Sequence, residues 1–530
     1  MKFLRFPTGT EKVSFERGTE FPKKHNKKME VYMKKKISVL FLALVLLLTL
    51  LLLACSENSN DTTDDETYEE AQNIQKDEAE ADEDILAQYD FGGREIRILT
   101  SINESENWLT NSNYMIEGTG EITGELVNDA VYKRNMDVEN LLNVTFKYTH
   151  IDEDWATVQR EISKLILSGT DTFDLIINDL RSLFSLSLEG MFLNVNNNNV
   201  FDLSQSYWYK DFMDDVSIGK EKSFILAGDY FVDILRNCHA LFLNKSMLND
   251  QMQGASDELY QKVIDGKWTF DEFLTLTKDF LKDINGDGVY KNADDQFGFI
   301  CVGTWGSAMP FMISADTDLL TKDADGIPSL TMNNPKSLLL HEYLSKLFSP
   351  DSGGNSTFDG GELISQFQSR RGLMVGYQRL ATLEQLRGME DEVSILPYPK
   401  LNLEQQKYRT NPNNIAEVGV IPTTTSDFDV VCVVVEALNR ETKNTVLPAY
   451  YEQSLKIKYA RDEASAQIID IIHDNMGNVL PVALEEQIPD LLTIFNVTSN
   501  KNFTSAYERI ENRTKEKLNK VIELFLTAGD

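Results

Sequence analysis

The sequence lacks the short motifs that mark the common catalytic sites. It contains no GxSxG, no HExxH and no GxxxxGK[ST], the patterns of a serine nucleophile, a zinc site and a phosphate-binding loop. Histidine is rare, and those beyond residue 55 are scattered without motif context: His150, His239, His341 and His473. Gly118-Thr119-Gly120 with Gly124 has the wrong spacing for a dinucleotide loop. The sequence therefore predicts a protein that is not an enzyme.

Cysteine and positive charge are also scarce. The four cysteines form no CxxC pair, and three of them (Cys238, Cys301 and Cys432) lie in apolar segments, which predicts buried free thiols rather than disulfides or a zinc site. Lysine and arginine number 51 against 84 acidic residues, for a formal net charge of −33. Such a balance disfavours nucleic acid and anionic lipid surfaces as partners, since both are bound by basic patches.

One long apolar run is present, from Ile37 to Ala54, and it follows Lys34-Lys35-Lys36. Lysines before an apolar segment are typical of a signal peptide. Leu52-Leu53-Ala54-Cys55 resembles the bacterial lipobox, in which the chain is cut before a diacylated cysteine. We therefore expect a signal peptide over residues 1–54, a true start at Met33, and a lipid on Cys55. The run is also long enough to span a bilayer, so an uncleaved anchor helix stays open. Both alternatives place the rest of the chain outside the cytoplasm.

A strongly acidic segment follows Cys55. The stretch from Ser56 to about Asp84 has almost no large apolar side chains and cannot bury enough surface to offset its chain entropy. We expect residues 55–88 to form the lipidated cysteine and a disordered tether. The 54 residues before Cys55 carry 11 Lys and Arg and four Asp and Glu, so the remaining chain has a net charge near −40.

Strand and helix patterns alternate after the tether. The predicted elements are a strand at Glu95–Leu99, a helix at Leu126–Leu142, a strand at Val144–Tyr148, a helix at Trp155–Leu167 and a strand at Phe173–Ile177. Strands connected by helices predict a parallel sheet. Ligands of such sheets bind at the carboxyl ends of the strands, here 100–107 and Asn178-Asp179.

Further elements are expected toward the carboxyl terminus. Phe224–Leu243 has the pattern of a long strand, and Thr269–Glu272 has that of a capping box opening a helix to about Lys282. The others are helices at Lys336–Leu347, Leu363–Ser369 and Phe428–Leu438, strands at Phe297–Val302, Gly372–Gly376, 393–399 and 418–422, and mostly helix from Pro448 to Leu526.

An acidic loop at Asp283–Asp294 has the spacing of a calcium-binding loop. Oxygen donors stand at positions 1, 3, 5 and 12, the carbonyl of position 7 is available, and glycine occupies position 6, where the turn needs positive φ. The predicted ligands are Asp283, Asn285, Asp287, Val289, Asp294 and the adjacent Asp295. Donors that are all oxygen favour Ca²⁺ over zinc. The alternative is an acidic turn without a metal.

Short motifs along residues 90–530 resemble one family when taken in order. They are Asp90-Phe91-Gly92-Gly93, Asn128–Asn135, Ser168–Leu175, Ala227-Gly228-Asp229, Phe242–Lys245, Trp268–Phe273, the loop at Asp283, Ile395–Lys400 and Leu447–Tyr451. In this order behind a lipobox, the chain resembles the family 1 extracellular solute-binding proteins of ABC importers. The resemblance implies an α/β fold with two lobes of the type II periplasmic-binding-protein kind, joined by crossing strands, and a ligand cleft between them. It implies lobe 1 at 89–228 and 393–445, and lobe 2 at 229–392 and 446–530.

The resemblance also implies a set of ligand-binding residues. Family members stack sugar rings on aromatic side chains and hydrogen-bond the hydroxyls with polar ones. The positions in comparable places are Trp108, Asn178, Asp179, Arg181, Asp229, Tyr230, Trp305, Tyr377 and Arg379. Rigid aromatic faces suit the apolar side of a pyranose, and amides and carboxylates suit its hydroxyls.

The implied function is the capture of a carbohydrate by a lipid-anchored, monomeric protein at the bacterial cell surface. Its partners would be the permease subunits of an ABC importer, and its only membrane contact the lipid on Cys55. Two alternatives stay open. One is a surface-anchored polysaccharide hydrolase, because a catalytic acid pair cannot be recognised among so many carboxylates. The other is the same fold used as a sensor for a membrane kinase.

Overall fold

The computed structural model describes residues 85–102, 113–290, 294–303, 305–358, 360–386, 388–455 and 463–529. The predicted signal peptide, Cys55 and most of the predicted tether lie outside these residues. Ile85–Gln88 forms the 3₁₀ turn η1 with Leu86 buried, so the last four residues of the predicted tether are ordered. None of the described helices is both long enough and apolar enough to cross a membrane.

The first sheet has four strands in the order β11-β3-β1-β2. β1 (Arg94–Ile102) pairs in parallel with β2 (Val144–Asp152) and β3 (Leu175–Asp179), whereas β11 (Glu417–Val420) is antiparallel to β3. The predicted parallel sheet is thus confirmed. The connecting helices are α3 (Leu126–Leu142), α4 (Trp155–Leu167) and α5 (Leu180–Ser187). α3 ends at Asn143, whose φ of 51° places it in the left-handed conformation typical of a helix end.

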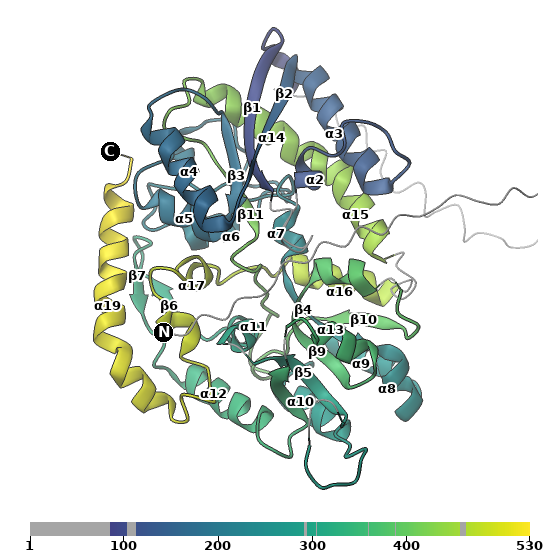
Figure 1. Ribbon diagram of the computed structural model, residues 1–530. Helices are drawn as coiled ribbons and strands as arrows, with labels where there is room; N and C mark the ends of the chain where they lie inside the picture. Colours follow the sequence, from purple (N-terminus) through teal and green to yellow (C-terminus); the bar gives the residue numbers. More distant parts are fainter. Residues whose placement is uncertain are drawn as a thin grey trace, which may run out of the picture. The chain divides into compact units, whose positions relative to one another are not determined.

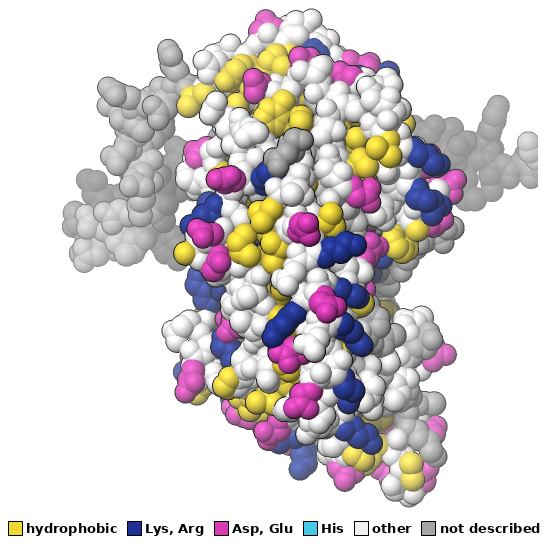
Figure 2. All heavy atoms as spheres, turned by 90° about the vertical axis from the view of Figure 1, so that its left-hand side faces the viewer, with side chains coloured by type: hydrophobic (Ala, Val, Ile, Leu, Met, Phe, Trp, Pro, Cys, Tyr) yellow, Lys and Arg dark blue, Asp and Glu magenta, His cyan; other side chains and the backbone are white. Residues whose placement is uncertain are grey.

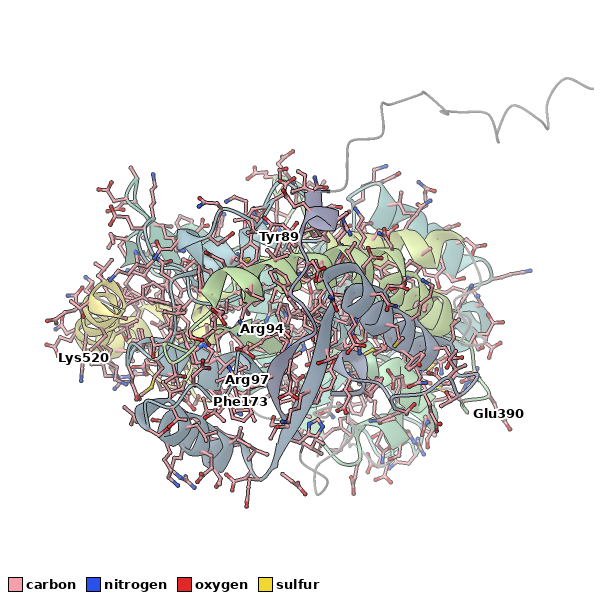
Figure 3. All side chains as sticks on the ribbon, turned by 90° about the horizontal axis from the view of Figure 1, so that it is seen from above. Tyr89, Arg94, Arg97, Phe173, Glu390 and Lys520 are labelled. Carbon is pink, nitrogen blue, oxygen red and sulfur yellow. The ribbon has the colours of Figure 1, made fainter. Side chains whose placement is uncertain are left out.

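Ion pairs fix the amino-terminal edge of this sheet. Asp174 accepts hydrogen bonds from Arg97 N at 2.8 Å and Arg97 Nε at 2.9 Å, and Arg94 Nη2 lies 3.2 Å from its other oxygen. Figure 3 shows Arg94 and Arg97 close to Phe173 at this edge. These charged groups pair with one another at the edge opposite the carboxyl ends of the strands. They therefore stabilise the sheet and do not belong to a ligand site at its carboxyl edge.

The second sheet has five strands in the order β10-β4-β9-β5-β8. The strands are β4 (His239–Asn244), β5 (Phe297–Val302), β8 (Gly354–Phe358), β9 (Gly372–Arg379) and β10 (Val393–Leu396). β5 is parallel to β8 and β9, and β4 is antiparallel to β9 and β10. Aromatic rings at about 5–6 Å separation fill the core beside it: Trp268, Phe270, Phe273, Phe299, Phe311 and Tyr398.

Two predicted elements differ from the structure. Phe224–Leu243 is not one strand: α7 (Asp233–Arg236) interrupts it, and β4 begins only at His239. The run is apolar because nearly all of it is buried, and such a run carries no period that separates strand from helix. The predicted capping box does not form either. Thr269 makes no side-chain cap to α10 (Phe270–Asp279), and Phe270 N donates to the carbonyl of Lys400 at 3.0 Å instead.

Three chain segments run between the two sheets. The first leads from Leu226 to β4, the second from β10 to β11, and the third follows α16 (Glu463–His473). Bridges join Cys238 to Pro412 and Thr410 to Met476, so the three lie side by side. β10 pairs with β4, which moves the predicted lobe boundary at 393 to a point after Leu396. α15 (Val446–Leu455) packs on α3, so the last crossing begins after it and not at 446.

The remaining elements cover the sheets. They are α2 (Asn113–Ile116), η3 (Val195–Asn197), α6 (Lys210–Val216), α8 (Lys245–Gln251), α9 (Ala255–Ile264), η4 (Trp305–Ala308), α11 (Met309–Ser314), β6 (Leu320–Lys322), β7 (Pro328–Leu330), α12 (Pro335–Leu347), α13 (Leu363–Gln368), η5 (Leu380–Leu386), α14 (Phe428–Asn444), α17 (Leu480–Ala483), α18 (Asp490–Thr493) and α19 (Phe503–Thr527).

α19 packs against elements attached to both sheets. Near its start it contacts α12, along its length it contacts β7, and near its end Phe525 packs on Phe184 and Phe224. Figure 1 shows it in yellow, beside α12 and the β6–β7 hairpin. Side chains of both charges are interspersed over this face (Figure 2). α19 thus ties the two sheets together at a place away from the three crossing segments.

Candidate functional site

An exposed tryptophan lies at the carboxyl edge of the four-stranded sheet. Trp155 opens α4 three residues after β2 ends, and it is 41% exposed. Asp154 caps the helix by accepting from Ala156 N and Thr157 N at 3.1 Å. The Arg181 guanidinium lies 3.8 Å from the centre of the indole ring, within cation–π range. The indole is therefore both accessible and fixed in orientation.

The end of β3 positions Arg181. Asp179 caps α5, because its carboxylate accepts from Ser182 N at 2.9 Å and from Ser182 Oγ at 2.8 Å. Arg181 Nε also reaches Asp179, at 3.3 Å. The neighbouring Asn178 is buried, and its side-chain oxygen accepts from Ser101 Oγ at 2.9 Å. Asp179 is thus a helix cap that also steers the guanidinium, and Asn178 links β3 to β1.

Residues on or after two of the crossing segments, Asn414 and Glu485, lie next to Arg181. Arg181 N donates to the Asn414 carbonyl at 3.1 Å, and the Asn414 side-chain amide donates to the Glu485 carboxylate. Burial raises the pKa of Glu485, whereas the charge of Arg181 and the Asn414 hydrogen bond lower it. Neither Asn414 nor Glu485 belongs to a recognisable motif, and only the crossing topology brings them to Arg181.

The five-stranded sheet contributes Tyr377 and Arg379 from the end of β9. Tyr377 has φ 57°, and its backbone N donates to Tyr398 Oη at 2.7 Å. Its ring stacks on His239 at 5.3 Å with a 24° tilt. Burial raises the pKa of Tyr377, and a hydrogen bond with Asn413 opposes the shift. Arg379 Nη1 donates to Asn237 Oδ1 at 3.2 Å.

These residues form one constellation drawn from both sheets. Asn413 and Asn414 are consecutive on the second crossing segment and connect the Tyr377 end to the Arg181 end. We call the set the cross-lobe site: Trp155, Arg181, Tyr377, Arg379, Asn414 and Glu485. Of the predicted residues, the structure brings Asp179, Arg181, Tyr377 and Arg379 to it. An aromatic face and several hydrogen-bonding groups are there on each side.

Asp229 and Tyr230 lie elsewhere. Tyr230 is fully buried, and Arg134 stacks over its ring at 4.8 Å. Asp229 is buried with one carboxylate oxygen 3.7 Å from His473 Nε2, beside Tyr209. Neither contacts the cross-lobe site in the part of the chain that the structure describes. Trp108 and the side chain of Trp305 lie outside the described residues.

In the predicted calcium loop, the acidic side chains accept hydrogen bonds from the backbone of the loop itself. Asp283 accepts from Gly286 N at 2.7 Å and Gly288 N at 2.8 Å, and Asp287 accepts from Val289 N at 2.8 Å. Asp295 is buried and accepts from Ile284 N at 2.9 Å. Residues 291–293 are outside the described part, and no group of three metal-ligating side chains gathers among the residues that are described. The described side chains of the first half, Asp283, Asn285 and Asp287, present only oxygen donors within a hydrogen-bonded turn.

Other cavities lie away from the cross-lobe site. One of about 170 Å³ is bounded by Asp215, Lys322 and Asn478 among others, and one of about 390 Å³ by Lys336 and Arg409 among others. Neither of these two has an aromatic side chain in its wall. A third, of about 190 Å³, has Trp268 in its wall, but this side chain is buried and its Nε1 donates to the Pro397 carbonyl at 3.0 Å. None of the three therefore offers an exposed stacking face for a sugar.

No family model matches the sequence, and no curated protein sequence is significantly similar to it. Several solved structures are similar in fold. A cyclo/maltodextrin-binding protein complexed with maltotetraose is 10% identical, with 82% of this chain and 97% of that chain covered and a TM-score of 0.51. An ABC transporter solute-binding protein from Thermotoga lettingae, bound with α-D-tagatose, is 12% identical over 81% of this chain and 100% of that one, with a TM-score of 0.49. This chain therefore has the two-lobed α/β fold of periplasmic solute-binding proteins.

Proposed function

We propose that the chain is the solute-binding protein of an ABC importer and captures a carbohydrate between its two lobes. The observation that carries the proposal is the cross-lobe site, in which aromatic faces come from Trp155 at the start of α4 and from Tyr377 at the end of β9. Amide, carboxylate and guanidinium groups stand between them. An apolar face with a few converging polar groups is the composition that pyranose rings require. The fold supports the same class of ligand, because the maltodextrin-binding protein of similar fold holds maltotetraose.

Binding would proceed by closure of the lobes. A ligand that touches Trp155 and Arg181 on one side and Tyr377 on the other gains its full set of contacts only when the two sides approach. It therefore favours the closed state by its differential affinity for that state. The three crossing segments are the hinge, and Asn414 and Glu485 belong to it. The closed, loaded form would be recognised by the permease.

The proposed location is the outer face of the cell membrane. Cys55 would carry the lipid, and the acidic segment after it would hold the folded part away from the membrane. The Asp283–Asp294 loop would bind Ca²⁺ for structure. Its first three predicted side-chain donors, Asp283, Asn285 and Asp287, all present oxygen atoms, which suits a hard cation. When bound, the ion would offset the repulsion among the loop's carboxylates.

A thermal-shift screen of the full-length protein against mono- and oligosaccharides tests the proposal. Ligands that bind the native state alone raise the melting midpoint by mass action, by about 2.7 kcal/mol of stability at a hundredfold excess over Kd. We expect at least one carbohydrate to raise the midpoint and to change the intrinsic tryptophan fluorescence. A complete lack of response to sugars, with a response to amino acids or peptides, would overturn the proposed ligand class.

A further inference from the structure

Arg379 is a half-buried positive charge with few partners. Among the described residues its one hydrogen bond runs from Nη1 to Asn237 Oδ1 at 3.2 Å, and no carboxylate oxygen lies within 4 Å of it. Burial lowers the pKa of Arg379, Tyr377 and the Asp233 charge oppose that shift, and the charge of Arg236 adds to it. A partly desolvated guanidinium with no carboxylate in direct contact can gain a charge-assisted pair from an anionic ligand.

The nearby carboxylates are engaged with other groups. Asp233 accepts from Arg236 Nη1 at 2.7 Å, from Asn237 Nδ2 at 2.6 Å and from Glu417 N at 3.1 Å. Glu384 lies 3.8 Å from Arg236 Nη2. Both acids contact Arg236 directly, and the charge of Asp233 acts on Arg379 only at longer range. At the far end of the site, Arg181 has Asp179 at 3.3 Å and feels the charge of Glu485. Within the cross-lobe site, Arg379 is the guanidinium without a carboxylate of its own.

The backbone presents Arg379 beside a stacking ring. It is the last residue of β9, and Tyr377 two residues earlier has the unusual φ of 57°. The register of β9 on β4 shifts here, between Ala240 and Phe242. Irregular, strained backbone persists where the surrounding structure holds it, and it clusters at binding sites. The arrangement sets a guanidinium at a fixed place next to the ring of Tyr377.

We propose that Arg379 binds the carboxylate of an acidic sugar, so that the ligand contains a uronic acid. This rests on the proposed function and names the class of saccharide. A guanidinium matches a carboxylate with two parallel N–H···O bonds, and a pyranose stacked on Tyr377 would direct its C5 carboxylate toward Arg379. The ligand then supplies the directly bonded carboxylate that Arg379 lacks.

The charge of the whole chain gives the proposal a kinetic signature. With a net charge of −33, the protein repels an anionic ligand at long range, and salt screens that repulsion. Association with a uronate should become faster as ionic strength rises from low salt. A neutral saccharide would show no such dependence.

The test compares oligomers of uronic acids with their methyl esters, which keep the size and remove the charge. Trigalacturonate, triglucuronate and trimannuronate are titrated into the full-length protein in detergent, each beside its ester. We expect at least one acid to bind roughly tenfold tighter than its ester, which is about 1.4 kcal/mol. Arg379→Gln should abolish that preference and Arg379→Lys should keep part of it, with melting midpoints confirming that both variants fold.

The outcomes separate this inference from the proposed function. Equal binding of acid and ester, or binding of neutral saccharides alone, overturns the acidic ligand and leaves carbohydrate capture standing. Binding of no saccharide of either kind overturns both. If Arg379→Gln still binds the acid more tightly than the ester, another group binds the carboxylate. The assignment of Arg379 would then be wrong.

Discussion

Tyr377 holds a bulky side chain in the left-handed region of the backbone, at φ 57°. For a residue with a Cβ this conformation costs about 1–2 kcal/mol, whereas glycine adopts it freely. Glycine is normally the less stable of two small replacements because it loses more entropy on folding. Here we expect the reverse: Tyr377→Gly should be more stable than Tyr377→Ala by about 1 kcal/mol. Urea denaturation of the two variants measures the difference.

Both variants should lose carbohydrate affinity to the same extent, since both remove the ring. Tyr377→Ala equal to or more stable than Tyr377→Gly would mean that the backbone is not strained at this position.

His239 makes stability depend on pH. Burial, with a contribution from the Arg379 charge, lowers the pKa of His239 to about 3 from an ordinary 6.5. As pH falls below 6.5 the unfolded chain therefore gains a proton here that the native state does not take up until pH nears 3. The resulting loss of stability reaches about 1.4 kcal/mol per pH unit.

The comparison with His239→Gln isolates this residue. The free energy of unfolding of the wild type should fall relative to the variant as pH is lowered from about 6 to about 4. Parallel curves for the two proteins over that window would show that His239 protonates equally in both states.

At the scale of elements, the sequence pattern predicts a helix or strand correctly where one face of the element is buried and the other is exposed. α3 was predicted at Leu126–Leu142 and observed there, because its buried face has a helical period and Asn143 suits the left-handed end. Segments buried on both sides lack that signal. The run from Phe224 to Leu243 was predicted as one strand, yet the Asp233–Arg236 ion pair and α7 lie within it.

The candidate site could be predicted only in part, for the same reason. Asn178 and Asp179 follow a predicted strand, so the rule about carboxyl ends of parallel strands finds them, whereas Arg181 comes only from the family resemblance. Trp155 fits the same rule, since it lies three residues after the end of β2, but the sequence pattern by itself indicates only the start of a helix. Asn414 and Glu485 have no local signal, because distant crossing segments bring them together.

The Asp283–Asp294 loop connects α10 to β5, so an ion in it would fix the approach of two core elements. We expect the wild-type melting midpoint to be higher in millimolar calcium than in EDTA. At a hundredfold excess over Kd the gain is about 2.7 kcal/mol. Asp287→Ala should remove most of the difference, whereas Asp279→Ala, a matched change at the end of α10, should not. If the melting midpoint of the wild type is the same in calcium and in EDTA, the loop is an acidic turn that binds no calcium.

For the whole molecule, the predicted lipid on Cys55 would anchor the protein to the outer face of the cell membrane. Cys55→Ala should lose acyl-dependent partition into the detergent phase of a cloud-point separation, because the thioether-linked lipid can no longer form. The N-terminus of the wild type should begin at residue 55. Unchanged partition and an uncut apolar run in the variant would point to the alternative, an uncleaved anchor helix.

The central claim is that one carbohydrate touches both lobes at the cross-lobe site. Titration calorimetry of the strongest saccharide from the screen, with wild type, Trp155→Ala, Tyr377→Ala and the exposed control Leu167→Ala, tests it most directly. We predict that each aromatic variant loses about 1–3 kcal/mol of binding free energy and that Leu167→Ala binds as the wild type does. Wild-type affinity in both aromatic variants would contradict the account and move the ligand away from this site.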